Sequence, residues 1–468
     1  MKSRTPRRKK SRQLTPRYLA WNALLAPFVP AIGAYTLWRR YVKKKSAASL
    51  RGQWGMVPRE VVNALHADTS STRIWLHAVS VGETMAARPL ARALKKTIPN
   101  CVIALSVTTD TGYETAQSAL KANEVDGVFY FPLDIPLSVN RVLDLVQPHA
   151  FLTLETELWP NVLHLAHARG IQTFLVNGRV SDNLLRRAPQ LGALWRWMMS
   201  NLDGLLMRSD FDAQRMLALG ASREKVIVTG DVKLDAATVS SHELRAQWRQ
   251  VLQIRDDALF FVAGSTHDGE EEIVLRVWQT LKNEFPTLRV LVAPRHIERV
   301  EDVLAICEKL QLKAARRSEI DIRNKQYDII ILDSVGELSQ IYAAADVAFV
   351  GGSLIRRGGH NLLEPVLGGA PVAFGPHIAN FRAHAQLVEE ADVGKVVNDE
   401  KELTETLRAW LRDEKWCHDV ATRADKTLQP HRGASTRVAE IVAQALGFTA
   451  EDAEVAEKNE KRGKATSV

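Results

Sequence analysis

Residues 74–83 read IWLHAVSVGE, and this stretch sets the expected fold. Ile74–Ala78 is an apolar run of strand length, the Ser80–Gly82 turn follows it, and Glu83 opens a helical pattern. A short apolar strand that leads through a tight turn into a helix is the unit from which parallel α/β sheets are built. The stretch therefore predicts a parallel sheet and places Glu83 beside the carboxyl end of one strand.

The same alternation of short apolar runs and helical patterns continues along the chain. In the first half the predicted strands are Ile74–Ala78, Val102–Ser106, Val128–Phe131, Ala150–Leu154, Thr173–Val176, Gly204–Met207 and Val226–Thr229. In the second half they are Leu259–Ala263, Arg289–Ala293, Ile329–Leu332, Val347–Val350 and Val372–Phe374, with helices expected at 270–284 and 402–412. We therefore expect two open α/β domains, joined through a polar, helical linker at Asp235–Gln253, with the ligand site in the cleft between them.

Composition narrows the class of protein. The 468 residues are 46% hydrophobic and 25% charged, as in an ordinary globular protein. The cysteines at 101, 307 and 417 are isolated, which argues against a disulfide framework and favours buried small side chains. His267, His296 and His360 fit no zinc-ligand spacing, so neither a metal nor a cofactor is expected.

The N-terminal region combines basic and apolar stretches. Eight lysines and arginines lie between Lys2 and Arg17, and six more lie between Arg39 and Arg51. Between these runs, Tyr18–Trp38 carries no charge and has the length of a membrane-spanning helix, although Pro27 and Pro30 would kink or break it. The segment is expected to span the bilayer or lie at its interface, with basic flanks on anionic lipids. A cleaved signal peptide and a nucleic-acid-binding arm are the weaker alternatives.

Three polar motifs follow predicted strands of the first half. Glu83 in HAVSVGE could act as a general base, or it could only complement the dipole of the helix it opens. In LETELWPN, one of Glu155 and Glu157 is expected to reach the cleft, and Trp159–Pro160 is expected to start a helix. Lys233 in TGDVKLD could stabilise a leaving phosphate, or it could be a solvated linker lysine.

Three further motifs in the second half suggest anion or nucleotide binding. The Gly-Ser-Thr turn in residues 263–272 could bind an anion at a helix start, but the acidic residues after it weaken that interpretation. Arg295 offers a planar donor fork for phosphate, or is an ordinary surface arginine. In GGSLIRRGGHNLLEP, residues 351–365, paired glycines lead to a helix expected to start near His360, with Glu364 one turn later. This last stretch predicts a nucleotide pocket, and packing alone is the alternative.

In this order, the motifs HAVSVGE, FPLDIPLSVNRVLDLVQP, ETELWPN, VNGRVSD, GDVKLD, AGSTHDGEE, PRHIER and GGHNLLEP resemble the 3-deoxy-D-manno-octulosonic acid (Kdo) transferases of lipopolysaccharide synthesis. The resemblance covers about residues 18–448 and implies a GT-B fold. It implies an inverting, metal-independent transfer from CMP-Kdo to a lipid A precursor, at the cytoplasmic side of the inner membrane. Ile297 stands where many members of the family carry proline, and little effect is expected from that.

The resemblance also implies roles for individual residues. Glu83 would be the proton acceptor, and Glu155 and Lys233 would stabilise the transition state. The residues implied for CMP binding are Pro294, Arg295, Val335, Gly336, Glu337, Asn361, Leu362, Leu363 and Glu364.

The expected division of the chain follows from these assignments. It is a basic arm at 1–17, a membrane anchor at 18–38, a basic connector at 39–59, an acceptor domain at 60–235, a CMP-sugar domain at 236–448 and a disordered tail at 449–468. Two rival functions are a GT-B transferase that uses another nucleotide sugar and a membrane-tethered scaffold without activity. Glu83, Glu155 and Lys233 speak against the scaffold.

Overall fold

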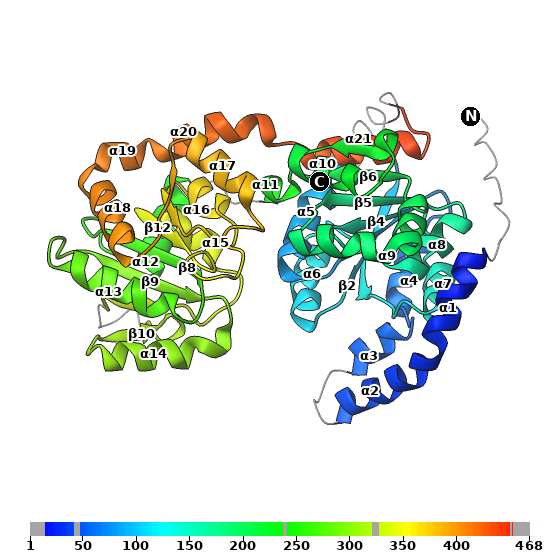
Figure 1. The fold of residues 1–468 in the computed structure, drawn as a ribbon, viewed down its shortest axis with the longest axis horizontal. Helices are drawn as coiled ribbons and strands as arrows, with labels where there is room; N and C mark the ends of the chain where they lie inside the picture. The colour runs from blue at the N-terminus through cyan, green and yellow to red at the C-terminus, as the bar shows by residue number, and fades with distance from the viewer. Residues whose placement is uncertain (1–14, 42–46, 237–240, 321–326, 450–451, 453–468) are drawn as a thin grey trace, which may run out of the picture. The chain divides into compact units, whose positions relative to one another are not determined.

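The computed structural model describes residues 15–41, 47–236, 241–320, 327–449 and 452 (Figure 1). Contacts divide the chain into two compact units, of which unit 1 contains Met1–Ala236 and Arg432–Val468 and unit 2 contains Ala237–His431. Nearly all of the predicted basic arm and of the predicted disordered tail lies outside the described residues.

Unit 1 is built around a parallel sheet of seven described strands in the order β3-β2-β1-β4-β5-β6-β7. The strands are β1 (Thr72–Ala78), β2 (Cys101–Val107), β3 (Gly127–Tyr130), β4 (Ala150–Leu154), β5 (Gln172–Gly178), β6 (Gly204–Met207) and β7 (Val226–Val228). The helices around it are α3 (Ala47–Gln53), α4 (Arg59–His66), α5 (Val81–Thr97), α6 (Asp110–Lys121), α7 (Pro136–Val146), α8 (Pro160–Ala168), α9 (Asp182–Ser200), α10 (Asp210–Ala218), α11 (Val232–Ala236) and α21 (Ala434–Ala445).

Apolar side chains cover both faces of this sheet. One core layer joins the sheet to α4, α7, α8 and α9, and the other joins it to α5, α6 and α21. All five residues of β4 are buried, as expected for a strand enclosed on both faces. The chain order reverses between β1 and β4, and in such sheets ligands bind beside the carboxyl ends of the strands at this point.

Unit 2 repeats the architecture, with strand order β10-β11-β9-β8-β12-β13-β14 among the described residues. Its strands are β8 (Phe260–Thr266), β9 (Arg289–Pro294), β10 (Ala314–Arg316), β11 (Ile329–Ile331), β12 (Val347–Val350), β13 (Val372–Phe374) and β14 (Gly394–Val396). Its helices are α12 (His242–Val251), α13 (Glu270–Lys282), α14 (Val300–Lys309), α15 (Leu338–Ile341), α16 (Leu363–Leu367), α17 (Arg382–Glu390), α18 (Glu400–Arg412), α19 (Glu414–His418) and α20 (Val420–Leu428). The chain order reverses between β8 and β12.

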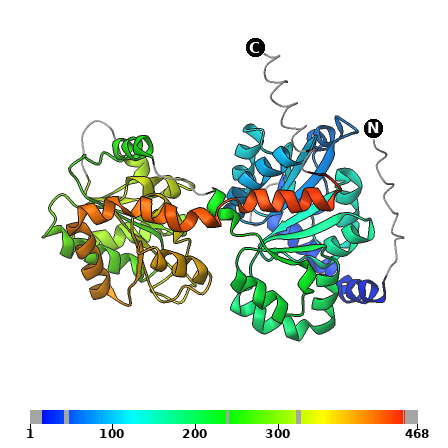
Figure 2. The same cartoon turned by 90° about the horizontal axis from the view of Figure 1, so that it is seen from above.

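The end of the chain departs from the predicted domain boundary. The sequence assigns residues up to 448 to the second domain, but α21 belongs to unit 1 and lies along its surface, where it is drawn red in Figure 2. Val438 and Val442 of α21 are fully buried in the same core layer as Leu90 of α5. The Asp235 carboxylate also accepts the N–H groups of Gly433 and Ser435, at 2.8 and 2.7 Å. The chain therefore enters unit 2 once and returns to finish in unit 1.

The apolar N-terminal segment is helical in two pieces. Helix α1 (Pro16–Leu25) and helix α2 (Val29–Tyr41) are separated by a 3-10 turn, η1 (Ala26–Phe28), so the predicted break at the prolines is confirmed. No helix within the described ranges is both long and apolar enough to cross a membrane. At its start, α1 is docked on unit 1, where Tyr18 stacks on His164 with ring centres 4.6 Å apart.

Candidate active site

Glu83 lies in the first turn of α5, directly after β1, as the sequence predicts. Ser80 caps the helix by accepting the Glu83 N–H, and the Glu83 carboxylate accepts the Val79 N–H through Oε2 at 2.6 Å. This pair of hydrogen bonds is a variant of the capping box. Glu83 therefore does stabilise the start of its own helix, as the alternative interpretation expects. Only Oε2 is engaged, however, and Oε1 has no partner in the described part of the chain. The carboxylate is thus held at one oxygen and available at the other.

Glu155 follows β4, the neighbour of β1 in the sheet, and has an unusual backbone. Its φ of 57° lies in the left-handed region, which costs a residue with a side chain about 1 kcal/mol or more. The conformation is held by the Glu155 N–H, which donates to the Val176 carbonyl at 2.9 Å. Residues in this region collect at functional sites, because the surrounding structure must enforce them. The strain therefore marks the end of β4 as a place where orientation matters.

Lys233 contacts Glu155 although it follows β7, an edge strand of the sheet. After β7 the chain turns back across the strand ends, where the Val232 N–H donates to the side chain of Asn177 on β5. Lys233, in α11, then forms a salt bridge with the Glu155 carboxylate. The structure thus brings together three residues that the sequence singled out separately. The interpretation of Lys233 as a solvated linker lysine is wrong.

The electrostatics of this cluster separate its two glutamates. Burial raises the pKa of Glu83 to about 7, and repulsion from Glu155 adds to the rise. Burial would also raise the pKa of Glu155, but Lys233 and then Arg179 lower it below its ordinary value. Two neighbouring carboxylates with pKa values pushed apart are typical of a site that divides acid–base work between them. Glu83 can accept a proton near neutral pH, while Glu155 stays ionised.

Sequence reasoning missed part of this cluster. Arg179 and Arg208 lie close enough to Glu155 to lower its pKa, and Glu157 lies close enough to raise that of Glu83. The prediction that only one of Glu155 and Glu157 would reach the site is therefore too strict, because both lie near Glu83. Arg179 stands in the VNGRVSD motif, directly after β5. Its position at the carboxyl end of a strand could have indicated that it belongs to the site.

In unit 2, the residues predicted to bind CMP follow strands β9, β11 and β12. Pro294 ends β9 and the exposed Arg295 follows it. Burial lowers the pKa of His360 to about 4, and the charge of Arg295 adds to this effect. Val335 and Gly336 precede α15, and the Glu337 carboxylate accepts hydrogen bonds from Arg317 and Ser334. The third group is Asn361, Leu362, Leu363 and Glu364, in which the Asn361 amide donates to Glu364 Oε1 at 3.0 Å. The three groups therefore follow the carboxyl ends of β9, β11 and β12, and in the sheet β8 lies between β9 and β12.

One detail of the predicted nucleotide pocket is wrong, and at Gly351 the packing alternative applies. The helix expected near His360 is the short α16, which starts at Leu363, so His360 is in the loop before it. A Cβ at Gly351 would lie 2.6 Å from the Ser265 carbonyl and 2.8 Å from Glu270 Oε2. Gly351 therefore lets the loops after β8 and β12 approach each other closely.

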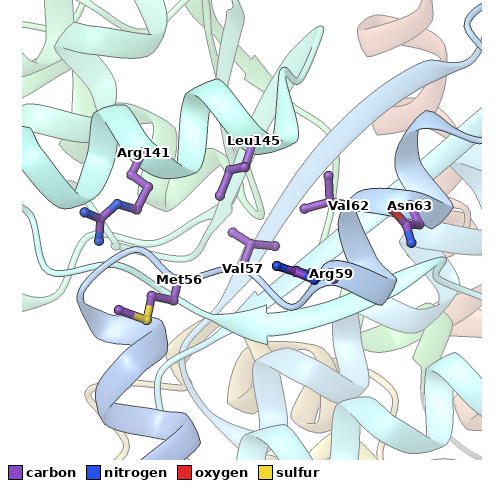
Figure 3. A pocket seen from close by; sticks show the side chains of 7 residues that line it. All are labelled: Met56, Val57, Arg59, Val62, Asn63, Arg141 and Leu145. Carbon is purple, nitrogen blue, oxygen red and sulfur yellow. The ribbon is translucent and has the colours of Figure 1, made fainter.

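A separate shallow pocket of about 550 Å³ lies on unit 1, at the groove between α4 and α7 (Figure 3). Its lining is apolar apart from Asn63 and two arginines, and consists of Met56, Val57, Arg59, Val62, Asn63, Arg141 and Leu145. This lining lacks the carboxylates of the Glu83 cluster. Elsewhere in the described ranges, no three His, Cys, Asp or Glu side chains are placed to hold a metal ion.

The sequence is similar to named proteins over most of its length. A family model described as 3-Deoxy-D-manno-octulosonic-acid transferase (kdotransferase) matches residues 49–236. The 3-deoxy-D-manno-octulosonic acid transferase of Haemophilus influenzae is 35% identical over 377 residues, which are 79% of this chain and 86% of that protein. The chain belongs to the Kdo transferase family. A second Kdo transferase, from Bordetella pertussis, is 32% identical over 389 residues, 80% of this chain and 87% of its own.

As a member of the Kdo transferases, the protein is a glycosyltransferase, and the resemblance read from its motifs is confirmed. Solved structures agree on the fold. A glycosyltransferase from Rickettsia africae superimposes with a TM-score of 0.58 at 11% identity, over 81% of this chain and 100% of that one. A UDP-GlcNAc 2-epimerase from Neisseria meningitidis gives a TM-score of 0.57 at 16% identity, over 80% of this chain and 99% of the other. These similarities support the two-sheet, GT-B-like architecture of this Kdo transferase.

Proposed function

We propose that this Kdo transferase moves Kdo from CMP-Kdo to a lipid A precursor, with inversion and without a metal or cofactor. The observation that carries the proposal is the cluster in unit 1, where the pKa of Glu83 is raised to about 7 beside the Lys233–Glu155 ion pair. A carboxylate that accepts a proton near neutral pH suits transfer to a hydroxyl, because the hydroxyl must lose its proton as it attacks.

In the proposed reaction, Glu83 accepts the proton of a sugar hydroxyl on the acceptor. The hydroxyl oxygen bonds to the anomeric carbon of Kdo from the face opposite CMP, and the bond between that carbon and the CMP phosphate oxygen breaks. CMP leaves with the electron pair, so a single displacement inverts the anomeric centre. Glu155 and Lys233 keep charges of opposite sign fixed beside the base, where developing charge can be stabilised without reorganisation.

The donor is proposed to bind in unit 2. The exposed guanidinium of Arg295 is suited to a phosphate, and the Glu364 carboxylate can accept hydrogen bonds from ribose hydroxyls. The segments 335–337 and 361–364 follow strands β11 and β12 of the same parallel sheet, and Val335 is 66% exposed although it is apolar. An apolar residue left open beside polar groups is expected where a base or sugar packs against the protein.

The acceptor is proposed to be reached at the cytoplasmic face of the inner membrane, with residues 18–38 lying against the lipid interface. Leu24, Phe28 and Trp38 are exposed, although large apolar side chains usually avoid water. The first helix of this segment is attached to unit 1, since the Asn22 amide donates to Asn161 Oδ1 at 2.8 Å. An apolar, aromatic-rich surface held on unit 1 would bring the Glu83 cluster to a lipid substrate.

The test is release of CMP by the purified full chain from CMP-Kdo and a tetraacylated lipid A precursor, in the presence of EDTA. We expect CMP and a Kdo-bearing lipid in equal amounts, at the same rate with and without the chelator. If no CMP is released, the proposed reaction is wrong. If EDTA abolishes an activity that added Mg²⁺ restores, the metal-independent mechanism is wrong.

A further inference from the structure

Glu270 in unit 2 is a buried carboxylate that the proposed reaction does not use. It is the first residue of α13, is 0% exposed and accepts four backbone N–H groups. Oε2 accepts those of His267 and Gly352, at 3.1 and 2.7 Å, and Oε1 accepts those of Ser353 and Leu354, each at 3.0 Å. Within the described part of the chain, no lysine or arginine forms a salt bridge with it. The backbone alone therefore satisfies this carboxylate.

The four bonds join two loops that lie far apart in the sequence. His267 is in the turn after β8, whereas Gly352, Ser353 and Leu354 are in the loop after β12. Consecutive N–H groups that point inward form an anion-binding nest, and here the protein fills the nest with its own side chain. The nest is thus not open to a phosphate, and its role is to fasten the two loops together.

Each of the two loops is joined to a segment proposed to bind the donor, the first by a hydrogen bond at the end of β8 and the second by the chain itself. In the first, the Thr266 carbonyl accepts the N–H of Arg295 at 2.9 Å. In the second, the Gly352 carbonyl accepts the N–H of Gly359 at 2.8 Å, and His360 and Asn361 follow at once. The imidazoles of His267 and His360 then meet with their Nε2 atoms 2.9 Å apart. Glu270 therefore lies at the junction between the Arg295 side and the Asn361 side of the site.

We propose that Glu270 is a positioning residue for the donor site, because its carboxylate sets the Arg295 loop against the 352–361 loop. It does not touch the donor. This inference rests on the proposed donor binding in unit 2. The competing explanation is that Glu270 only stabilises unit 2, as many buried hydrogen-bonded groups do.

Glu271 provides a matched control for Glu270. It is the next residue of the same helix and is equally buried, but its carboxylate pairs with Arg299, and Arg299 also pairs with Asp268. Both glutamates are replaced by glutamine, which keeps the shape. In Glu270→Gln the amide NH₂ faces two backbone N–H groups and cannot accept hydrogen bonds from them. In Glu271→Gln the two loops keep all four of their hydrogen bonds to Glu270.

We expect Glu270→Gln to raise KM for CMP-Kdo by about tenfold to a hundredfold with a smaller change in kcat, since misplaced binding groups weaken substrate binding. Hydrogen exchange at the amides of residues 352–354 should become faster in the same variant. Glu271→Gln should leave both quantities close to those of the unsubstituted protein. Glu270→Asp, which keeps two acceptor oxygens on a shorter arm, should fall between them and provides the measurement if Glu270→Gln does not fold.

Equal KM values for the two glutamine variants would overturn the proposal, as would faster exchange at residues 352–354 with an unchanged KM. The affinity for CMP alone, measured by calorimetry, separates this inference from the proposed function. If the unsubstituted chain binds CMP but transfers no Kdo, the proposed reaction fails. The role of Glu270 is then decided by whether Glu270→Gln, and not Glu271→Gln, weakens CMP binding.

Discussion

At the scale of single residues, the account depends on the environment of Glu83. A glutamate at a helix start on the surface would have an ordinary pKa, and its negative charge would mainly stabilise the helix through the helix dipole. Here the side chain is 7% exposed and lies beside a second carboxylate, and these two conditions keep its proton until about neutral pH. The position after β1 could be predicted from the sequence. The burial and the neighbours could not, since they depend on β4 and on Lys233, which are distant along the chain.

Replacement of Glu83 separates catalysis from stability. We expect Glu83→Gln to lower kcat by about a hundredfold to ten-thousandfold, the usual contribution of a general base. The pKa of Glu83 is higher in the folded chain than in the unfolded one, so its ionisation makes the folded state less stable as pH rises toward 7. The variant should therefore be as stable as the unsubstituted protein at pH 8, or more stable, by urea unfolding. A stable variant with normal turnover would remove Glu83 from the mechanism.

At the scale of elements, the apolar patterns predicted all seven described strands of unit 1 and the five inner strands of unit 2, but not the two edge strands of unit 2. The strands predicted at Ala150–Leu154 and Val347–Val350 are found with those bounds, because each is a short, wholly buried run. The edge strands β10 (Ala314–Arg316) and β14 (Gly394–Val396) of unit 2 were not predicted, since their sequences, AAR and GKV, contain no run of large apolar residues like the VIV of β7. The helix predicted near His360 starts at Leu363 instead. The residues before it form a loop in which the Gly359 N–H donates to the Gly352 carbonyl, a contact that helical periodicity does not indicate.

The return of the chain into unit 1 depends on one element, α21. Loss of the cap in Asp235→Ala should destabilise unit 1 by about 1 kcal/mol, the usual effect of removing a helix-capping side chain. Hydrogen exchange along residues 434–445 should become faster. Asp399→Ala is the control, since Asp399 caps α18 in unit 2 by accepting the Glu402 N–H. Unchanged exchange in α21 of Asp235→Ala would show that packing alone holds this helix.

At the scale of the whole molecule, the sequence predicted two parallel α/β domains and erred on where the second one ends. Hydrophobic periodicity identifies the strands and helices of a segment, but the unit on which a terminal helix packs is decided by contacts far along the chain. Val438 and Val442 fit the core layer around Leu90, and nothing in the sequence of α21 itself indicates that partner.

The proposed membrane contact is also a property of the whole chain. We expect the full-length protein to float with vesicles that contain anionic phospholipid. Phe28→Glu should weaken this binding by about tenfold, since it removes a large apolar side chain, 58% exposed, from the interface. Leu191→Glu, on α9, is the control, because it changes another exposed apolar residue of unit 1. Equal flotation of the two variants would exclude residues 18–38 as the contact.

The most direct test of the central claim is the dependence of CMP release on pH, at saturating CMP-Kdo and lipid acceptor. If Glu83 is the base, the rate should be constant above about pH 7 and fall close to tenfold for each pH unit below it, with the protein still folded by circular dichroism. The residual rate of Glu83→Gln should lack this dependence. A rate that stays constant down to about pH 5, where an ordinary glutamate begins to take up its proton, would contradict the account.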